Sequence, residues 1–389
     1  MEIYILDDTL RRTEIVESYE SMIWTQRYSA YGDFELRMDP SLAEAPLFVQ
    51  GTRLACDKSN RVMVIDTVEN TFKEDGTKTL IISGKSLESV LNERPNQRAF
   101  ATAGAIAEKL TLTGLPAAII RTLFDDICRI NSVIPTDNIP YIQSGEISPG
   151  DTIPEPSDVV TILTEIDTLY NTIKNISDIY RLGFRLIRPA EDSKLYFEVY
   201  TGFNRTTSQT VNTAVVFSAE LDNLTDTTEL TSTALLKNVA YVFSPNGSRI
   251  VYAAGTDPSI AGFEKKVLIV NASDIDLVAG TPLNAALDQR GAEELAKTGV
   301  IIGFDGQIPS LNSYVYGVDY KLGDIVEKRN DKGTTSQMRV TEQIFVSDAE
   351  GDKSYPTLTL DAVITAGSWD SIAGNKAWDD YTTQTWDSM

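Results

Sequence analysis

The sequence predicts a β-rich α+β fold in which two small β-barrel domains flank an α/β middle region. Residues 1–96 and 300–366 each contain several short apolar and β-branched runs separated by turns, and residues 34–38 alternate at period two, which is typical of strands. Between these blocks, apolar residues recur at three- and four-residue spacing in several stretches, which is typical of helices. The chain has 389 residues, enough for roughly two to four domains.

The first segment, residues 1–96, predicts about six strands, the size of a small barrel or sandwich. The expected strands cover residues 2–6, 14–20, 22–28, 34–38 and 51–57, followed by a hairpin over 61–83. Gly76 supplies the positive φ that the hairpin turn needs.

Gly84 is predicted to end this hairpin and to act as a structural joint between strand and helix. We expect it to take a backbone conformation that is costly for other residues. Ser86 is the expected N-cap of a short helix that carries Leu87, Val90 and Leu91 on one face.

The run Ser83-Gly84-Lys85-Ser86 also matches the end of a phosphate-binding loop. Such a loop needs a glycine five residues before the second one, but Thr79 stands there, inside the expected strand. The sequence therefore favours the strand-to-helix joint over a nucleotide site.

The middle segments, residues 97–225 and 226–299, mix helices and strands. Pro116 suits the first turn of a helix, and Gly183 is the expected C-cap of another. The predicted helices cover residues 102–112, 116–130, 168–182 and 281–297, with a proline-rich surface loop over 131–158. The predicted strands cover residues 184–188, 195–201, 215–219, 234–244, 248–253 and 265–271.

The fourth segment, residues 300–366, again predicts a small barrel. Its expected strands cover residues 300–304, 314–320, 323–328, 334–345 and 355–364. The last segment, residues 367–389, is small and polar, yet it holds three of the four tryptophans, Trp369, Trp378 and Trp386, each followed by Asp. Tryptophan is a frequent interface anchor, so these three are candidate partner-docking residues.

The net charge of −22 argues against binding to nucleic-acid backbones or to an anionic membrane surface. The chain has no histidine, which removes the commonest general base and imidazole metal sites. Cys56 and Cys128 are expected to be buried and apolar in character. We expect no signal peptide, no membrane-spanning segment, no cofactor, no metal and no catalytic residues.

Two acidic patterns are explained by solvated surface charge and by a turn, without a catalytic or metal site. The pairs Asp7-Asp8, Asp125-Asp126 and Asp379-Asp380 are adjacent in sequence, so they point apart and are expected to be solvated. The acidic run at 348–352 lacks the glycine and glutamate that a calcium-binding loop requires, and predicts a hairpin turn instead.

Three short stretches resemble the tail hub proteins of long-tailed, non-contractile phages that infect Gram-positive hosts. The first runs from Trp24 through Tyr28 to Tyr31-Gly32-Asp33-Phe34-Glu35-Leu36. The second is Leu80-Ile81-Ile82-Ser83-Gly84-Lys85-Ser86-Leu87, with Arg94 after it. The third is Tyr320-Lys321-Leu322-Gly323-Asp324-Ile325-Val326.

This resemblance implies a homotrimer in the virion, at the distal tip of the tail. Each chain would supply two tube-like barrels, so that three chains cap a hexameric tube. A distal tail or tail-tube protein would lie above the ring and a tail-tip or fibre protein below it. DNA would pass through without specific binding, and an acidic lumen would keep it from adhering. Many relatives carry a C-terminal peptidase, lysin or fibre region, and we expect none here.

Two other functions stay open at this point. A carbohydrate-binding tail-tip module would use the three tryptophans as stacking platforms, which requires that they sit on a rigid face. A cell-wall hydrolase would use a pair of carboxylates facing each other across a cleft. The first is tested by the geometry of the indoles, and the second by activity on host cell wall.

Overall fold

The computed structural model describes residues 1–360 except 17, 98–108, 132–133, 145–154, 190–192, 224, 274, 276–282, 300, 308–313 and 330–334. It contains two compact units. The first consists of Met1–Thr228 and Phe304–Thr359, and the second, in its described part, of Glu229–Gly303 with Leu360. The boundaries of the five predicted segments stay predictions beside this division.

The N-terminal strands form where the period-two alternation predicts them. They are β1 (Ile3–Leu6), β2 (Arg12–Val16), β3 (Ser21–Arg27), β4 (Asp33–Met38), β5 (Arg53–Cys56), β6 (Ser59–Phe72) and β7 (Lys78–Ser86). Their inward side chains, among them Met22, Trp24, Phe34 and Leu36, form a buried core. Burial of each such side chain stabilises the fold by about 1.5–3 kcal/mol. The β6–β7 hairpin turns as predicted, with Gly76 at φ +87°.

The middle region packs two helices against a β-hairpin. Helix α1 (Pro116–Phe124) begins at the predicted proline and continues into a π-helical turn (Asp125–Arg129), and α2 spans Leu169–Tyr180. The hairpin consists of β11 (Gly183–Ile187) and β12 (Leu195–Tyr200). Phe124 of the helix stacks on Phe197 of the hairpin, with ring centroids 3.8 Å apart, inside one hydrophobic cluster.

Three predictions for the middle region are wrong. Residues 109–112 belong to a strand, β8 (Lys109–Gly114), which pairs with β10 (Val160–Glu165); the rest of the predicted helix lies outside the described residues. Helix α2 ends with Arg181 at φ +55° rather than with Gly183, which starts β11. The predicted loop at 131–158 contains β9 (Ile142–Ser144).

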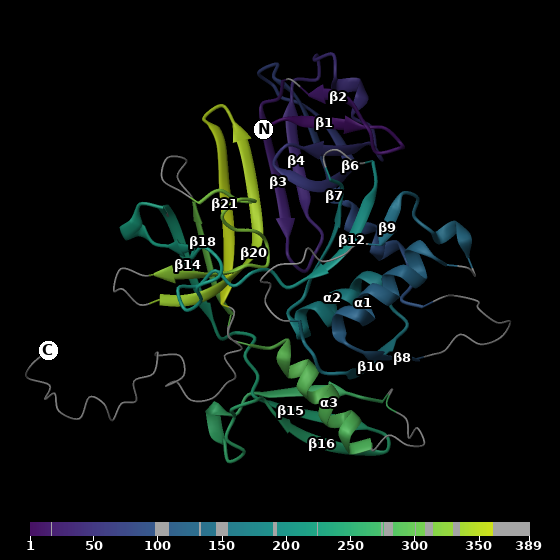
Figure 1. Cartoon of the computed structure of the whole chain (residues 1–389), viewed down its shortest axis with the longest axis vertical. Helices are drawn as coiled ribbons and strands as arrows, with labels where there is room; N and C mark the ends of the chain where they lie inside the picture. Colours follow the sequence, from purple (N-terminus) through teal and green to yellow (C-terminus); the bar gives the residue numbers. More distant parts are fainter. Residues whose placement is uncertain are drawn as a thin grey trace, which may run out of the picture. The chain divides into compact units, whose positions relative to one another are not determined.

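The first and last strands of the chain belong to one 16-stranded sheet. Its longest path runs β14-β18-β21-β20-β3-β4-β7-β6-β11-β12-β9. The late strands are β13 (Val216–Phe217), β14 (Thr225–Ser232), β18 (Ile301–Gln307), β19 (Ile325–Arg329), β20 (Thr335–Asp348) and β21 (Gly351–Leu360). Strand β20 pairs antiparallel with β3, from Glu342 opposite Arg27 to Ser347 opposite Met22 (Figure 1).

The β-rich α+β class is confirmed, and most predicted strands of the last block are present. The predicted strand over 314–320 is wrong: this stretch is a turn, with Gly317 at φ +86° and a single bridge between Tyr316 and Tyr320. The described strands show no closed barrel, so the two barrel domains stay a prediction.

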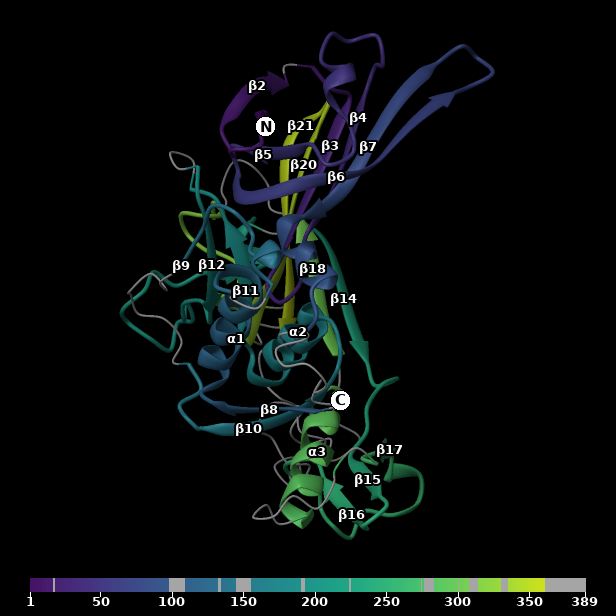
Figure 2. The same ribbon diagram turned by 90° about the vertical axis from the view of Figure 1, so that its right-hand side faces the viewer.

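The second unit is a three-stranded sheet with one helix. Strand β15 (Val239–Ser244) lies between β16 (Gly247–Tyr252), which is antiparallel to it, and β17 (Val267–Asn271), which is parallel. Helix α3 (Leu283–Ala296) packs on one face of this sheet (Figure 2). The core between helix and sheet includes Val242, Val270, Leu287 and Leu295.

Candidate assembly site

The three stretches that resemble tail hub proteins meet in the first unit. Trp24 lies opposite Phe34 across β3–β4 and opposite Phe345 across β3–β20. The N–H of Gly32 donates to Ser86 Oγ over 2.7 Å, which joins the first stretch to the second. The third stretch reaches the first through Gly323, which lies against the ring of Tyr28. These stretches are therefore parts of one packed site, although they are far apart in sequence.

Tyr28 and Arg339 hold backbone segments together at the centre of this site. Arg339 Nη1 donates to the carbonyls of Thr201 and Gly323 over 2.7 and 2.8 Å, and its guanidinium lies 5.2 Å from the Tyr28 ring centre. A Cβ atom on Gly183 or Gly323 would lie 2.3 or 2.5 Å from Tyr28 Cε2. Both glycines therefore let the backbone approach the ring, and a larger residue would displace it.

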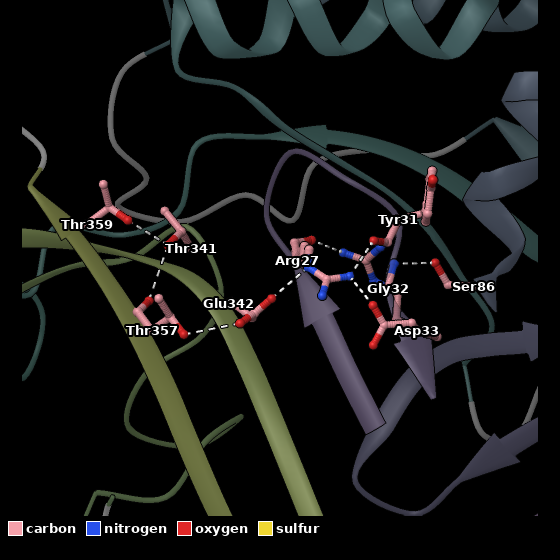
Figure 3. A network of polar contacts seen from close by, with 10 residues as sticks. Arg27, Tyr31, Gly32, Asp33, Ser86, Thr341, Glu342, Thr357 and Thr359 are labelled. Carbon is pink, nitrogen blue, oxygen red and sulfur yellow. Dashed lines mark hydrogen bonds and ion pairs between the residues drawn. The ribbon is translucent and has the colours of Figure 1, made fainter. Parts of the chain in front are cut away.

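Arg27 links β3 to its neighbours on both sides (Figure 3). Its Nε lies 2.6 Å from Glu342 Oε2 on β20, and its Nη1 lies 2.6 Å from Asp33 Oδ2 on β4. Nη1 also donates to the carbonyl of Tyr31 over 3.1 Å. Thr357 Oγ1 donates to Glu342 Oε1, which extends the network to β21. One guanidinium thus fixes the register between the N-terminal and C-terminal strands.

A buried ion pair lies behind this network. The Arg61 and Glu88 side chains are 2% and 0% exposed and are directly paired. Glu88 follows Ser86 in a 3-10 helix (Leu87–Glu93) and also accepts the N–H of Leu186 over 2.8 Å. Arg61 Nη2 donates to the carbonyl of Arg27 over 3.0 Å. Removing one partner of such a pair costs about 3–5 kcal/mol, because it leaves a buried charge uncompensated.

Gly84 is required for a different reason from the one predicted. It lies inside β7, which continues to Ser86, and it is not among the glycines at positive φ, so the predicted costly conformation is wrong. A Cβ atom there would lie 1.8 Å from the Val64 carbonyl oxygen and 2.9 Å from Phe34 Cε1. The β6 strand bulges opposite this position, between residues 65 and 67. Close backbone approach therefore excludes a side chain at Gly84.

Two other sequence patterns lie in ordinary strands and turns of the described chain. Residues 83–86 lie within β7, so no phosphate-binding loop is present there. Lys353 Nζ lies 3.4 Å from Asp348 and 2.5 Å from Glu350, and Asp352 pairs with the N-terminal amine, so the charge of the acidic hairpin turn is partly offset. Among the described residues, no group of three or more Cys, Asp or Glu could hold a metal ion.

Burial raises the pKa of the Cys56 thiol to about 12, and that of the Cys128 thiol also to about 12. Both are free, as predicted. In the part of the chain that the structure describes, no helix is both long and apolar enough to cross a membrane. Trp369, Trp378 and Trp386 lie outside the described residues.

The β6–β7 hairpin has an unpaired edge that the sequence did not reveal. Strand β5 pairs with β6 only up to Val64, and β4 pairs with β7 only from Leu80 onward. Among the described strands, the edge of β6 over residues 66–72 therefore has no neighbour except β7, and the hairpin projects beyond the sheet (Figure 2). Phe72 at its tip is 70% exposed. The edge of β6 is exposed because β4 and β5 end before they reach it, and local sequence does not encode where those strands end.

A family model for siphovirus ReqiPepy6 Gp37-like proteins matches residues 2–358. No curated protein matches the sequence. Three solved structures share the fold at 13% identity. The first is a tail protein from Neisseria meningitidis MC58, with a TM-score of 0.56, and the match covers 94% of this chain and 98% of that one. The second is the 43 kDa tail protein of prophage MuSo2 from Shewanella oneidensis, with a TM-score of 0.53, covering 94% of this chain and 99% of that one. The third is prophage tail protein gp18 from Listeria monocytogenes EGD-e, with a TM-score of 0.51, covering 96% of this chain and 97% of that one.

Proposed function

The chain belongs to the family of siphovirus ReqiPepy6 Gp37-like proteins, and we propose that it is a tail hub, a structural protein that forms a homotrimeric ring at the distal end of the tail tube. Membership in this siphovirus family, together with a fold shared with prophage tail proteins, supports a role in the phage tail. The hub role rests on the resemblance of its three landmark stretches and on one feature of the sheet.

The observation that carries this proposal is the pairing of β3 with β20. It joins the N-terminal and C-terminal strands edge to edge, so that one copy presents two groups of strands in a continuous sheet. Three copies around a closed axis would alternate six such groups, which matches a hexameric tube. The predicted pair of barrels would then be completed by neighbouring copies rather than within one chain.

The projecting β6–β7 hairpin is the contact we assign to the neighbouring copy in this ring. An unpaired strand edge offers backbone donors and acceptors for strand addition. Phe72 adds an apolar side chain that loses its exposure to water on contact. The hairpin of one copy would therefore seat against the sheet of the next, which is the head-to-tail contact that a cyclic ring requires.

The net charge of −22 supports passage of DNA without binding. A polyanion is held by clustered Lys and Arg, whereas an acidic lumen repels it. The ring would lie between a distal tail or tail-tube protein above and a tail-tip or fibre protein below. We assign the docking of these or of neighbouring copies to Trp369, Trp378 and Trp386. The Gram-positive host that the resemblance implies stays a prediction.

Imaging of the assembled protein by electron cryo-microscopy tests the hub role. We expect a three-fold ring in which the groups formed by residues 1–96 and 300–366 alternate, with more acidic than basic side chains on its inner surface. A two-fold particle, or the two groups at opposite ends of the particle, would contradict the proposal. A positively charged channel would contradict the proposal that an acidic lumen repels DNA and so lets it pass without binding. Digestion of host cell wall by the purified chain would favour the hydrolase instead.

A further inference from the structure

The sheet of the second unit has one face that no described helix covers. Helix α3 packs on the face that carries Val242 and Val270. Alternation sends the neighbouring side chains of the same strands to the opposite face. This opposite side is called the open face here and is defined by Tyr241, Phe243, Ile250 and Ile269.

The open face is apolar and continuous across the three strands. Tyr241 lies opposite Ile250 on β16 and opposite Ile269 on β17, which puts these three side chains in one row. Phe243 follows two residues further along β15 on the same side. Ile250, Phe243 and Ile269 are 52%, 49% and 75% exposed, so the row is available for contact. A contiguous apolar surface of this kind marks an interaction site.

A basic side chain lies at the edge of this surface. Lys265 precedes β17, and its Nζ lies 5.3 Å from the centre of the Tyr241 ring. The hydrogen bond with Tyr241 raises the pKa of Lys265, which favours the charged form of the amine. A matching ligand would combine a flat apolar group for the row with an adjacent carboxylate for Lys265.

The chain itself contains such a ligand three times. Trp369, Trp378 and Trp386 are each followed by an aspartate, and they lie in residues 361–389, outside the described residues. Those 29 residues can extend up to ~100 Å, so their reach does not limit which face they contact. Indole burial and the Asp–Lys attraction would both favour binding to the open face.

We propose that the open face of the second unit binds the Trp-Asp pairs of the C-terminal segment. This inference rests on the docking role that the proposed function gives the three tryptophans, and it names the surface they meet. The longest strands of the face, β15 and β16, have six residues each and span about 20 Å. The tryptophans are eight or nine residues apart, about 26–30 Å when extended. One face therefore takes one pair at a time, and the three pairs are interchangeable.

A photo-crosslinking experiment on the full chain tests this inference. The photoreactive residue p-benzoylphenylalanine replaces Ile269 on the open face, and in a control it replaces Phe263, which is 101% exposed but lies outside the three strands. Trypsin cuts after Lys376, so Trp378 and Trp386 fall in the peptide 377–389 and Trp369 in the peptide 354–376. We expect these two peptides in roughly tenfold more crosslinks from position 269 than from position 263.

Variants of the tail sharpen the result. Trp378→Ala alone should lower the crosslink yield less than twofold, because another pair takes its place, whereas replacing all three tryptophans by alanine should abolish it. Equal yields from positions 269 and 263, or an unchanged yield in the triple variant, would overturn the inference. Mixing isotopically heavy and light copies identifies whose tail is bound. If crosslinks form only within one copy, the open face is still the binding surface of the tail. That result would contradict the proposed function, in which the tryptophans dock on a neighbouring copy or on another tail protein.

Discussion

Arg27 and Glu342 are 315 positions apart in sequence, and their side chains form an ion pair with Nε and Oε2 2.6 Å apart. The pair lies at one end of the antiparallel register between β3 and β20. It therefore marks the place where the first strands of the chain join the last hairpin. The joined sheet is the feature on which the proposed ring depends.

The first prediction concerns the energy of this link. Arg27→Ala removes the contacts to Glu342 and Asp33, and both arginine and glutamate side chains are partly exposed. After allowance for solvent screening, we expect a loss of about 1 kcal/mol in the free energy of unfolding. A double-mutant cycle with Glu342→Ala, measured by urea unfolding, should show coupling between the two residues. As a control, Arg37→Ala breaks the exposed Arg37–Glu35 pair and should cost less. Zero coupling in the cycle would show that Arg27 does not hold the register.

The second prediction concerns Gly84. Gly84→Ala places a Cβ atom against the Val64 carbonyl, and the backbone must move to relieve this clash. We therefore expect a loss of roughly 1–3 kcal/mol in the free energy of unfolding. The matched control is Gly76→Asn in the turn of the same hairpin, where φ is +87° and nothing lies within 4 Å. Asparagine tolerates that conformation, so the control should lose at most about 0.5 kcal/mol. Equal stability of Gly84→Ala and the wild-type chain would refute the close-approach explanation.

The third prediction concerns the hairpin tip. If Phe72 docks on a neighbouring copy, Phe72→Asp should weaken assembly by about 2 kcal/mol per contact, or more than tenfold. The melting temperature of the isolated chain should not change, because Phe72 is already exposed. Phe263→Asp, on the second unit, is the control and should assemble normally. The measurement is sedimentation over a concentration series, and unchanged association of Phe72→Asp would remove the hairpin from the interface.

The fourth prediction concerns the two thiols. Burial raises their pKa from 9.0 to about 12, above the value in the unfolded chain. Their contribution to stability is therefore complete below pH 9 and is lost as pH rises toward 12. At pH 8 the native chain should not react with a thiol reagent, and both cysteines should react in denaturant. Rapid labelling of either thiol in the native chain would mean that its site opens.

Local sequence predicted the elements whose signals are local. The alternation in β3 and β4 and the turn at Gly76 identified the N-terminal strands, and Pro116 marked the start of α1. Strand β8 was predicted as a helix because the alanines before it are typical of helices. Leu110 and Leu112 alternate with threonines, which is typical of a strand, but so short a pattern forms a strand only because it pairs with β10.

The packing of distant residues was beyond the reach of such signals. Gly183 lies beside Tyr28, and this contact, not a helix cap, explains the glycine. The joining of β3 to β20 depends on residues more than 300 positions apart, which no local pattern encodes. The exposed edge of β6 follows from where β4 and β5 end. The three stretches of the candidate site could therefore be predicted from the sequence, but not that they pack together into one site.

The most direct test of the proposed hub is the mass of the full chain in solution at increasing concentration, measured by light scattering during size-exclusion chromatography. We predict a species of three times the 42.8 kDa of one chain. A mass that stays at one chain, or that settles at an even multiple without a trimer, would contradict the trimeric ring.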